Sequence, residues 1–189
     1  MMYRTDSTQW IAFLRAINVG GHVVKMEHLR ALFSGCGFDD VATFIASGNV
    51  IFTSQSADRP ALEAQIEQAL ERALGYPVAS FLRTPAEVAA VGAAQPFPAD
   101  LLAAAGTMLY VLFLKHEPQP AARQRLAALA NQVDHFELIG RELYWMSCRS
   151  RGDSRISGAQ LERALAAPGT ARNITTVRKL AAKYGKPSG

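Results

Sequence analysis

The residues best suited to chemistry lie where an apolar strand is expected to run into a glycine-rich loop. The stretch Arg15-Ala-Ile-Asn-Val-Gly-Gly21 follows an apolar run and precedes an amphipathic segment with helical spacing. The Arg15 guanidinium, the Asn18 amide and the backbone N–H groups of Gly20 and Gly21 could together bind a phosphate or carboxylate. The spacing matches neither the P-loop nor the dinucleotide fingerprint. A tight bend that needs positive φ is therefore the favoured explanation of the two glycines.

Two later stretches carry polar side chains of the same kind. Ser47 and Asn49 flank a glycine in an expected two-residue hairpin turn, and Arg172 and Asn173 lie at the start of the last predicted helix. Asparagine beside a turn most often binds local backbone groups. The asparagines therefore have a structural explanation as well as a ligand-binding one.

No catalytic group can be assigned, and whether the protein is an enzyme stays open. Ser47 is not in a nucleophile-elbow motif, and no base can be named for it. The four histidines make no metal-binding spacing with cysteine or acidic residues, so we predict no metal and no cofactor. Cys36 and Cys148 are predicted to be reduced core thiols without a disulfide.

The charge of the chain is concentrated at its C-terminal end. Residues 149–189 hold nine Lys or Arg and two Asp or Glu, a net charge of +7, whereas the whole chain carries +4. The basic loop Arg149–Arg155 could clamp an anion or could be an ordinary solvated loop. Anions are the expected partners, and a small phosphorylated or carboxylated ligand is the leading expectation. The alternatives are a nucleic-acid-binding module, although no strand carries the RNP aromatic signature, and an enzyme of unassigned reaction.

The composition is typical of a folded protein of the cytoplasm. Hydrophobic residues make up 49% of the chain, and no apolar run is long enough to cross a membrane. The polar N-terminus lacks a signal-peptide pattern. We therefore expect a cytoplasmic protein that does not contact a membrane.

The order of predicted elements indicates an α+β protein made of two ferredoxin-like, βαββαβ-type halves with a C-terminal helix. The apolar runs Trp10–Ile17 and Thr107–Leu114 are predicted to be interior strands, one in each half. The halves are placed at residues 1–95 and 96–189, the second with the basic C-terminal helix. The second half shows no clear final strand, and the last helix, roughly Ala171–Tyr184, is expected in its place.

Three motifs, taken in order, resemble the uncharacterised bacterial family called domain of unknown function 1697. They are Arg15–Gly21, Ala46-Ser-Gly-Asn-Val-Ile-Phe52 and the stretch from Thr170 to Leu180. The family pattern usually has Gly where this chain has Ala16 and Trp-Asn where it has Ile174-Thr175. The resemblance implies two ferredoxin-like halves and no established activity.

The three motifs are expected to meet in space, although they are far apart in the chain. Their nitrogen-bearing side chains would then form a donor-rich pocket for an anion, helped by the positive end of the last helix. The alternative is a structural clasp in which backbone carbonyls accept from every donor.

Overall fold

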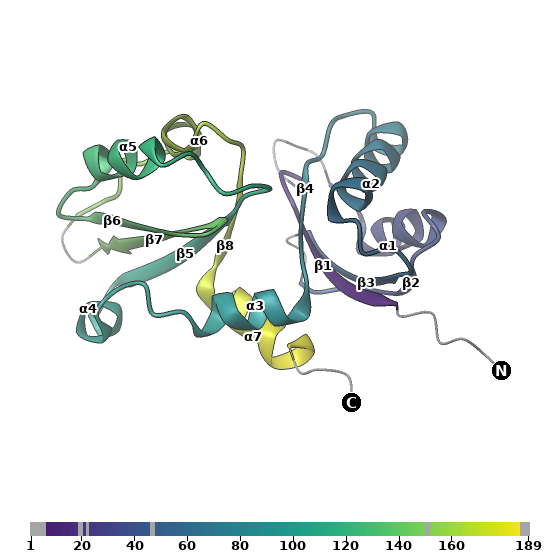
Figure 1. Ribbon diagram of the computed structural model, residues 1–189, viewed down its shortest axis with the longest axis horizontal. Coiled ribbons are helices and arrows are strands. Elements are labelled where there is room, and N and C mark those ends of the chain that lie inside the picture. The colour runs from purple at the N-terminus through teal and green to yellow at the C-terminus, as the bar shows by residue number, and fades with distance from the viewer. Residues whose placement is uncertain (1–6, 19–20, 22, 46–47, 150–151, 186–189) are drawn as a thin grey trace. The chain divides into compact units, whose positions relative to one another are not determined.

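The protein consists of two compact units, each built on one four-stranded antiparallel sheet (Figure 1). The computed structural model describes residues 7–18, 21, 23–45, 48–149 and 152–185. Unit 1 contains the described residues up to Val88 and those from Leu180 onward, and unit 2 is Ala89–Lys179. The boundary between the two halves that the sequence places between residues 95 and 96 stays a prediction.

Each unit contains the order βαββαβ followed by a helix, and unit 2 has an additional short helix before its first strand. Unit 1 contains β1 (Thr8–Leu14), α1 (Met26–Gly35), β2 (Asp39–Thr43), β3 (Asn49–Ser54), α2 (Arg59–Leu74), β4 (Ser80–Arg83) and the start of α3 (Pro85–Ala93). Unit 2 contains the rest of α3, α4 (Ala99–Ala103), β5 (Thr107–Phe113), α5 (Ala121–Leu129), β6 (Asp134–Ile139), β7 (Glu142–Cys148), α6 (Gly158–Leu165), β8 (Thr170–Asn173) and most of α7 (Ile174–Tyr184).

The strand orders confirm the two ferredoxin-like halves. Sheet A has the order β2-β3-β1-β4, and sheet B has the order β6-β7-β5-β8. All pairings are antiparallel, and β1 and β5 are interior strands, as their apolar sequences predict. The residues of β1 from Trp10 to Leu14 are apolar and buried, which agrees with a strand whose two sheet faces are both covered at that position.

The expectation that the second half lacks a final strand is wrong. Thr170–Asn173 forms β8, which pairs with β5, and α7 begins only at Ile174. The strand escaped the sequence analysis because it has four residues and places Arg172 where an apolar residue would signal burial. Long-range pairing with β5, rather than local propensity, sets its conformation.

The turn between β2 and β3 also differs from its prediction. The sequence predicts strands at 41–46 and 49–54, whereas β2 ends at Thr43 and β3 begins at Asn49. Gly48 has the positive φ expected of it, at 71°. Cys36 and Cys148 are both free, as predicted.

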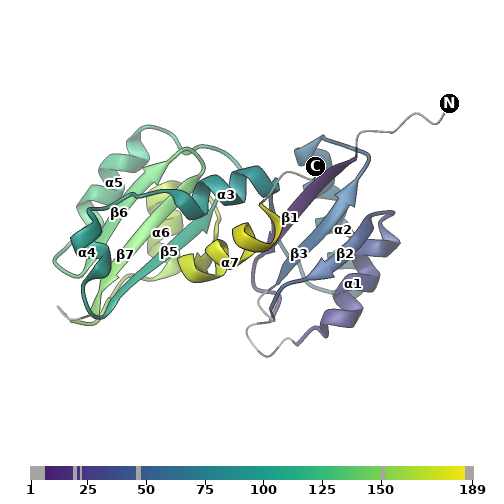
Figure 2. The ribbon, with the colours of Figure 1, turned by 90° about the horizontal axis from the view of Figure 1, so that it is seen from below.

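Helices cover each sheet on the face that carries its alternating leucines and aromatics. In unit 1, α1 and α2 pack on β1 and β3 through a core that includes Phe33, Ile66, Ala12 and Phe52. In unit 2, α5 and α6 pack on sheet B through a second core of mainly leucine side chains. Figures 1 and 2 show each helix pair on one face of its sheet.

The register reveals a residue-level duplication that the sequence alone does not show. Ile11 on β1 pairs with Arg83 on β4, and Val111 on β5 pairs with Arg172 on β8. In both halves the residue after an arginine of the last strand leads into a helix. Thr84 forms a capping box with Glu87, and the Asn173 side chain accepts from Thr175 N. Arg83 and Arg172 therefore occupy equivalent, buried positions.

Candidate functional site

The first motif begins at the end of β1, and its Asn18 side chain binds the local backbone. Arg15 directly follows the strand, and its backbone N–H donates to the backbone carbonyl of Ala79 at 2.9 Å. The Asn18 Oδ1 accepts from Val24 N at 2.7 Å, two residues before α1 begins. Gly21 has φ 87°, which agrees with a bend that favours glycine. Gly20 lies outside the described residues.

The second motif packs directly against the first. Leu14 N donates to Gly48 O at 2.8 Å, and Asn49 Nδ2 donates to Phe44 O at 3.1 Å. Asn49 is fully buried, so its amide stabilises the β2–β3 connection. In the same unit, the Lys183 Nζ lies 5.9 Å from the centre of the Phe44 ring. Ser47 lies outside the described residues.

Ala16 adopts a conformation that suits the glycine usual in the resembling family. Its φ is 57°, a left-handed conformation that costs roughly 1–2 kcal/mol for a residue with a Cβ. We expect Ala16→Gly to raise the free energy of unfolding by up to about 1 kcal/mol, because relief of strain exceeds the added entropy of the unfolded chain. Urea denaturation measures the change. A loss of stability would contradict the assignment of strain to this position.

The third motif lies in unit 2, where Arg172 and Asn173 end β8. The Arg172 Nη1 donates to Thr170 Oγ1 at 2.9 Å and to Ala171 O at 2.8 Å. Burial lowers the pKa of Arg172 to about 10, so the guanidinium is still charged at neutral pH. The structure thus brings the first two motifs together within unit 1. The meeting of all three motifs stays a prediction.

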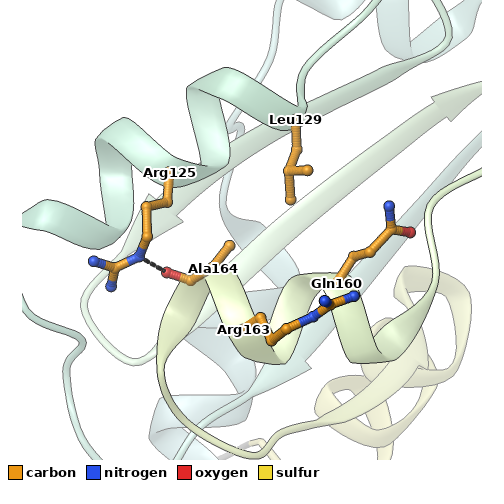
Figure 3. A pocket seen from close by; sticks show the side chains of 5 residues that line it. All are labelled: Arg125, Leu129, Gln160, Arg163 and Ala164. Atoms are coloured by element: carbon orange, nitrogen blue, oxygen red, sulfur yellow. Dashed lines mark hydrogen bonds between the residues drawn. The ribbon is translucent and has the colours of Figure 1, made fainter.

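A groove between α5 and α6 gathers donors that sequence analysis did not single out (Figure 3). It has a volume of about 360 Å³ and is lined by Arg125, Leu129, Gln160, Arg163 and Ala164. None of these residues is acidic. The sequence does not reveal this groove because its residues come from two helices about 35 positions apart, and neither helix carries a contiguous basic motif.

Both arginines of this groove are anchored to the backbone through the Nε atom alone. The Arg125 Nε donates to Ala164 O at 2.6 Å, and the Arg163 Nε donates to Ala159 O at 3.4 Å. The Gln160 Oε1 completes the α6 capping box with Ser157. Within the described part of the chain, the terminal nitrogens of both arginines and the Gln160 amide nitrogen bind no protein atom. These groups can therefore donate to a ligand.

A second pocket, of about 540 Å³, lies on sheet B. It is lined by Tyr110, Trp145, Ser147, Arg149, Asp153 and Ser154. Its aromatic residues come from different strands, so no local motif such as the RNP signature marks them in the sequence. Part of the basic loop 149–155 borders this pocket, with residues 150 and 151 outside the described residues.

The two sheets and their helices define a protein of two ferredoxin-like halves. The chain belongs to the family described as "Protein of unknown function (DUF1697)", whose sequence pattern matches residues 7–144. That match includes the first two motifs and ends before the third.

A solved structure supports the fold over almost the whole chain. The conserved bacterial protein SP0830 from Streptococcus pneumoniae is similar to this chain with a TM-score of 0.67 and 20% sequence identity. The alignment covers 95% of this chain and 99% of the other. No curated protein matches the sequence. None of the helices in the described part of the chain is long and apolar enough to span a membrane.

Proposed function

We propose that this protein binds a small phosphorylated or carboxylated ligand in the groove between α5 and α6. The observation that carries the proposal is the pair of guanidinium groups, from Arg125 and Arg163, whose terminal nitrogens bind no described protein atom and which line the same groove as Leu129 and Ala164. Arginine binds phosphate and carboxylate through paired N–H groups, and each charge-assisted contact is stronger than a neutral hydrogen bond.

The surroundings of the groove favour an anion over a cation. Arg125, Arg163 and the Gln160 amide nitrogen are all donors, whereas none of the described lining side chains is a carboxylate. Leu129 and Ala164 provide apolar contact for the carbon skeleton of a ligand. The volume lies within the range typical of small-molecule sites.

The residues predicted from the sequence are a second location for the same ligand. Arg15, Asn18, Gly20, Gly21, Ser47, Asn49, Arg172 and Asn173 form that set. The groove ranks first because Asn18 and Asn49 already use polar atoms on the local backbone, whereas the groove donors remain available. A cytoplasmic location belongs to this proposal, supported by the two free cysteines.

Replacement of Arg163 tests the proposal. We expect Arg163→Gln to weaken binding of a sugar phosphate or a short dicarboxylate about tenfold or more, because one charge-assisted contact is lost. Isothermal titration calorimetry with ribose 5-phosphate, inorganic phosphate and succinate measures the affinity. The melting temperature of the ligand-free variant should be unchanged, since Arg163 is exposed and its Nε bond is long.

Arg123→Gln is the matched control. Arg123 lies on α5, is exposed, and pairs with Glu137 at 3.7 Å instead of lining the groove. Its loss should leave anion affinity within about twofold, because exposed ion pairs contribute little. Equal losses in the two variants would show that total charge, not the groove, governs binding.

A third measurement separates small anions from nucleic acid. If the basic segment binds RNA, affinity should fall linearly with salt concentration on logarithmic axes, and charge reversal of Lys179 and Lys183 should flatten the slope. Binding of short RNA without binding of any small anion would overturn the proposal in favour of the nucleic-acid alternative.

A further inference from the structure

The pocket on sheet B is an aromatic-floored cavity that is independent of the α5–α6 groove. Tyr110 on β5 pairs across the ladder with Trp145 on β7, and the two rings lie 5.3 Å apart between centroids. Trp145 also stacks at 6.5 Å on Phe136 of β6. Three neighbouring strands thus contribute one row of rings, and two of its members line the cavity.

The row lies on the sheet face that α5 and α6 cover only in part. Alternation along β5 puts Tyr110 on the same face as Leu112 and Leu114, which belong to the core beneath those helices. Tyr110 and Trp145 themselves are only half-buried and line open space. The face of sheet B that packs under α5 and α6 therefore extends beyond these helices as a concave aromatic surface. A ligand can cover this surface where the helices do not.

The Trp145 indole is held in place by a buried carboxylate. Its Nε1 donates to Asp134 Oδ1 at 2.8 Å, and Asp134 is 1% exposed. The Asn131 side chain in turn contacts both Asp134 N, at 2.9 Å, and Asp134 Oδ2, at 3.4 Å. This chain of contacts fixes the plane of the ring before any ligand arrives, which lowers the entropy cost of binding.

The polar rim of the cavity is balanced in charge. Arg149 and Asp153 supply one positive and one negative group, and Ser147 and Ser154 supply hydroxyls that both donate and accept. A rim with donors and acceptors but no net charge suits a ring with mixed hydrogen-bonding edges better than it suits a multiply charged anion.

We propose that this cavity binds a neutral planar heterocycle of the nucleobase class, stacked on Trp145 and Tyr110, as the base of a nucleoside. Stacking on a fixed aromatic ring contributes substantially to base binding, and the rim can hydrogen-bond the edge of the base. The volume of about 540 Å³ admits one small ligand. Two of the rings line the cavity, which matches one stacked base rather than a run of stacked bases.

Tryptophan fluorescence and calorimetry with adenosine, uridine and ribose test the proposal on the full chain. A nucleoside should quench tryptophan emission, whereas ribose should not. Trp10 is 3% exposed and lies on β1 of unit 1, outside this cavity, so quenching should disappear in Trp145→Phe while calorimetric binding persists. Tyr110→Leu should weaken nucleoside binding about tenfold.

Phe136→Leu is the matched control, because it removes a ring from the same row that does not line the cavity. Its nucleoside affinity should stay within about twofold of the unaltered protein. Arg163→Gln should also leave adenosine binding unchanged, which separates this site from the anion groove. Absence of adenosine and uridine binding at millimolar concentration would overturn the proposal. Equal affinity in Tyr110→Leu, or binding of oligonucleotides without nucleosides, would do the same.

Discussion

Replacing Gly48 with alanine is expected to lower the free energy of unfolding by about 3 kcal/mol. The new Cβ would lie 2.5 Å from Ile17 Cγ2 and 3.2 Å from Leu14 Cβ. Both neighbours are at most 2% exposed, so neither can move into solvent. Overpacking of this kind costs roughly 1–3 kcal/mol, and the φ of 71° adds strain for any residue with a Cβ.

Gly75→Ala separates the two causes. Gly75 has a similar φ of 80° at the end of α2, but nothing lies within 4 Å of the position of its added Cβ. The free energy of unfolding of that variant should fall by only about 1 kcal/mol, because the left-handed backbone conformation is then the sole source of strain. Urea denaturation of both proteins gives the difference. Equal losses of unfolding free energy in the two variants would show that the contact of the added Cβ with Ile17 and Leu14 adds nothing to the backbone strain.

The sequence predicted most of the fold because local signals and burial agreed along most of the chain. The interior strands β1 and β5 contain most of the predicted apolar runs, and α2 begins after the N-cap Asp58 and ends at the left-handed C-cap Gly75. Prediction failed at β8 and at the β2–β3 connection. In both places long-range pairing, rather than local sequence, determines where the strand begins or ends.

The candidate sites were harder to predict than the fold. The asparagines of the motifs attracted attention because they stand out locally, and the structure gives Asn18 and Asn49 backbone-binding roles. The groove arginines and the rings of the aromatic row come from separate helices and strands. Only the tertiary fold brings them together, so no spacing in the sequence could identify them.

Arg172 is a ligand-binding candidate in the sequence, whereas its equivalence to the buried Arg83 indicates a structural role. Arg83 and Arg172 pair with equivalent residues of β1 and β5, and each donates from Nη1 to the carbonyl of the residue before it. Because both arginines make the same hydrogen bond to the local backbone, a structural role explains them more simply. A ligand-binding role would require a ligand site at the same place in each half.

Arg172→Ala is therefore expected to lower the free energy of unfolding of the ligand-free protein by about 2–3 kcal/mol. Truncation of a large buried side chain costs roughly 2–5 kcal/mol, and Thr170 Oγ1 and Ala171 O lose a charged donor. Relief of the buried charge offsets about 3 kcal/mol of these losses, because burial lowers the pKa of Arg172 to about 10. The losses together exceed this gain.

The free-energy cost of burying the charged Arg172 guanidinium depends on pH, and this dependence determines the pH range in which the experiment should be done. The folded protein releases the Arg172 proton more easily than the unfolded chain, so the cost of burying the charge is present below pH 10 and falls as pH rises above it. Between about pH 6 and 9 this cost is constant, and the difference between variant and unaltered protein should not change with pH.

Lys179→Ala, an exposed position on α7, controls for loss of one positive charge and should change stability by less than about 0.5 kcal/mol. Denaturation and anion titration of both variants then separate the two roles of the third motif. Lower stability in Arg172→Ala with retained anion affinity supports a structural clasp. Unchanged stability with lost affinity would instead place the anion at Arg172 and Asn173, and would move the binding site away from the α5–α6 groove.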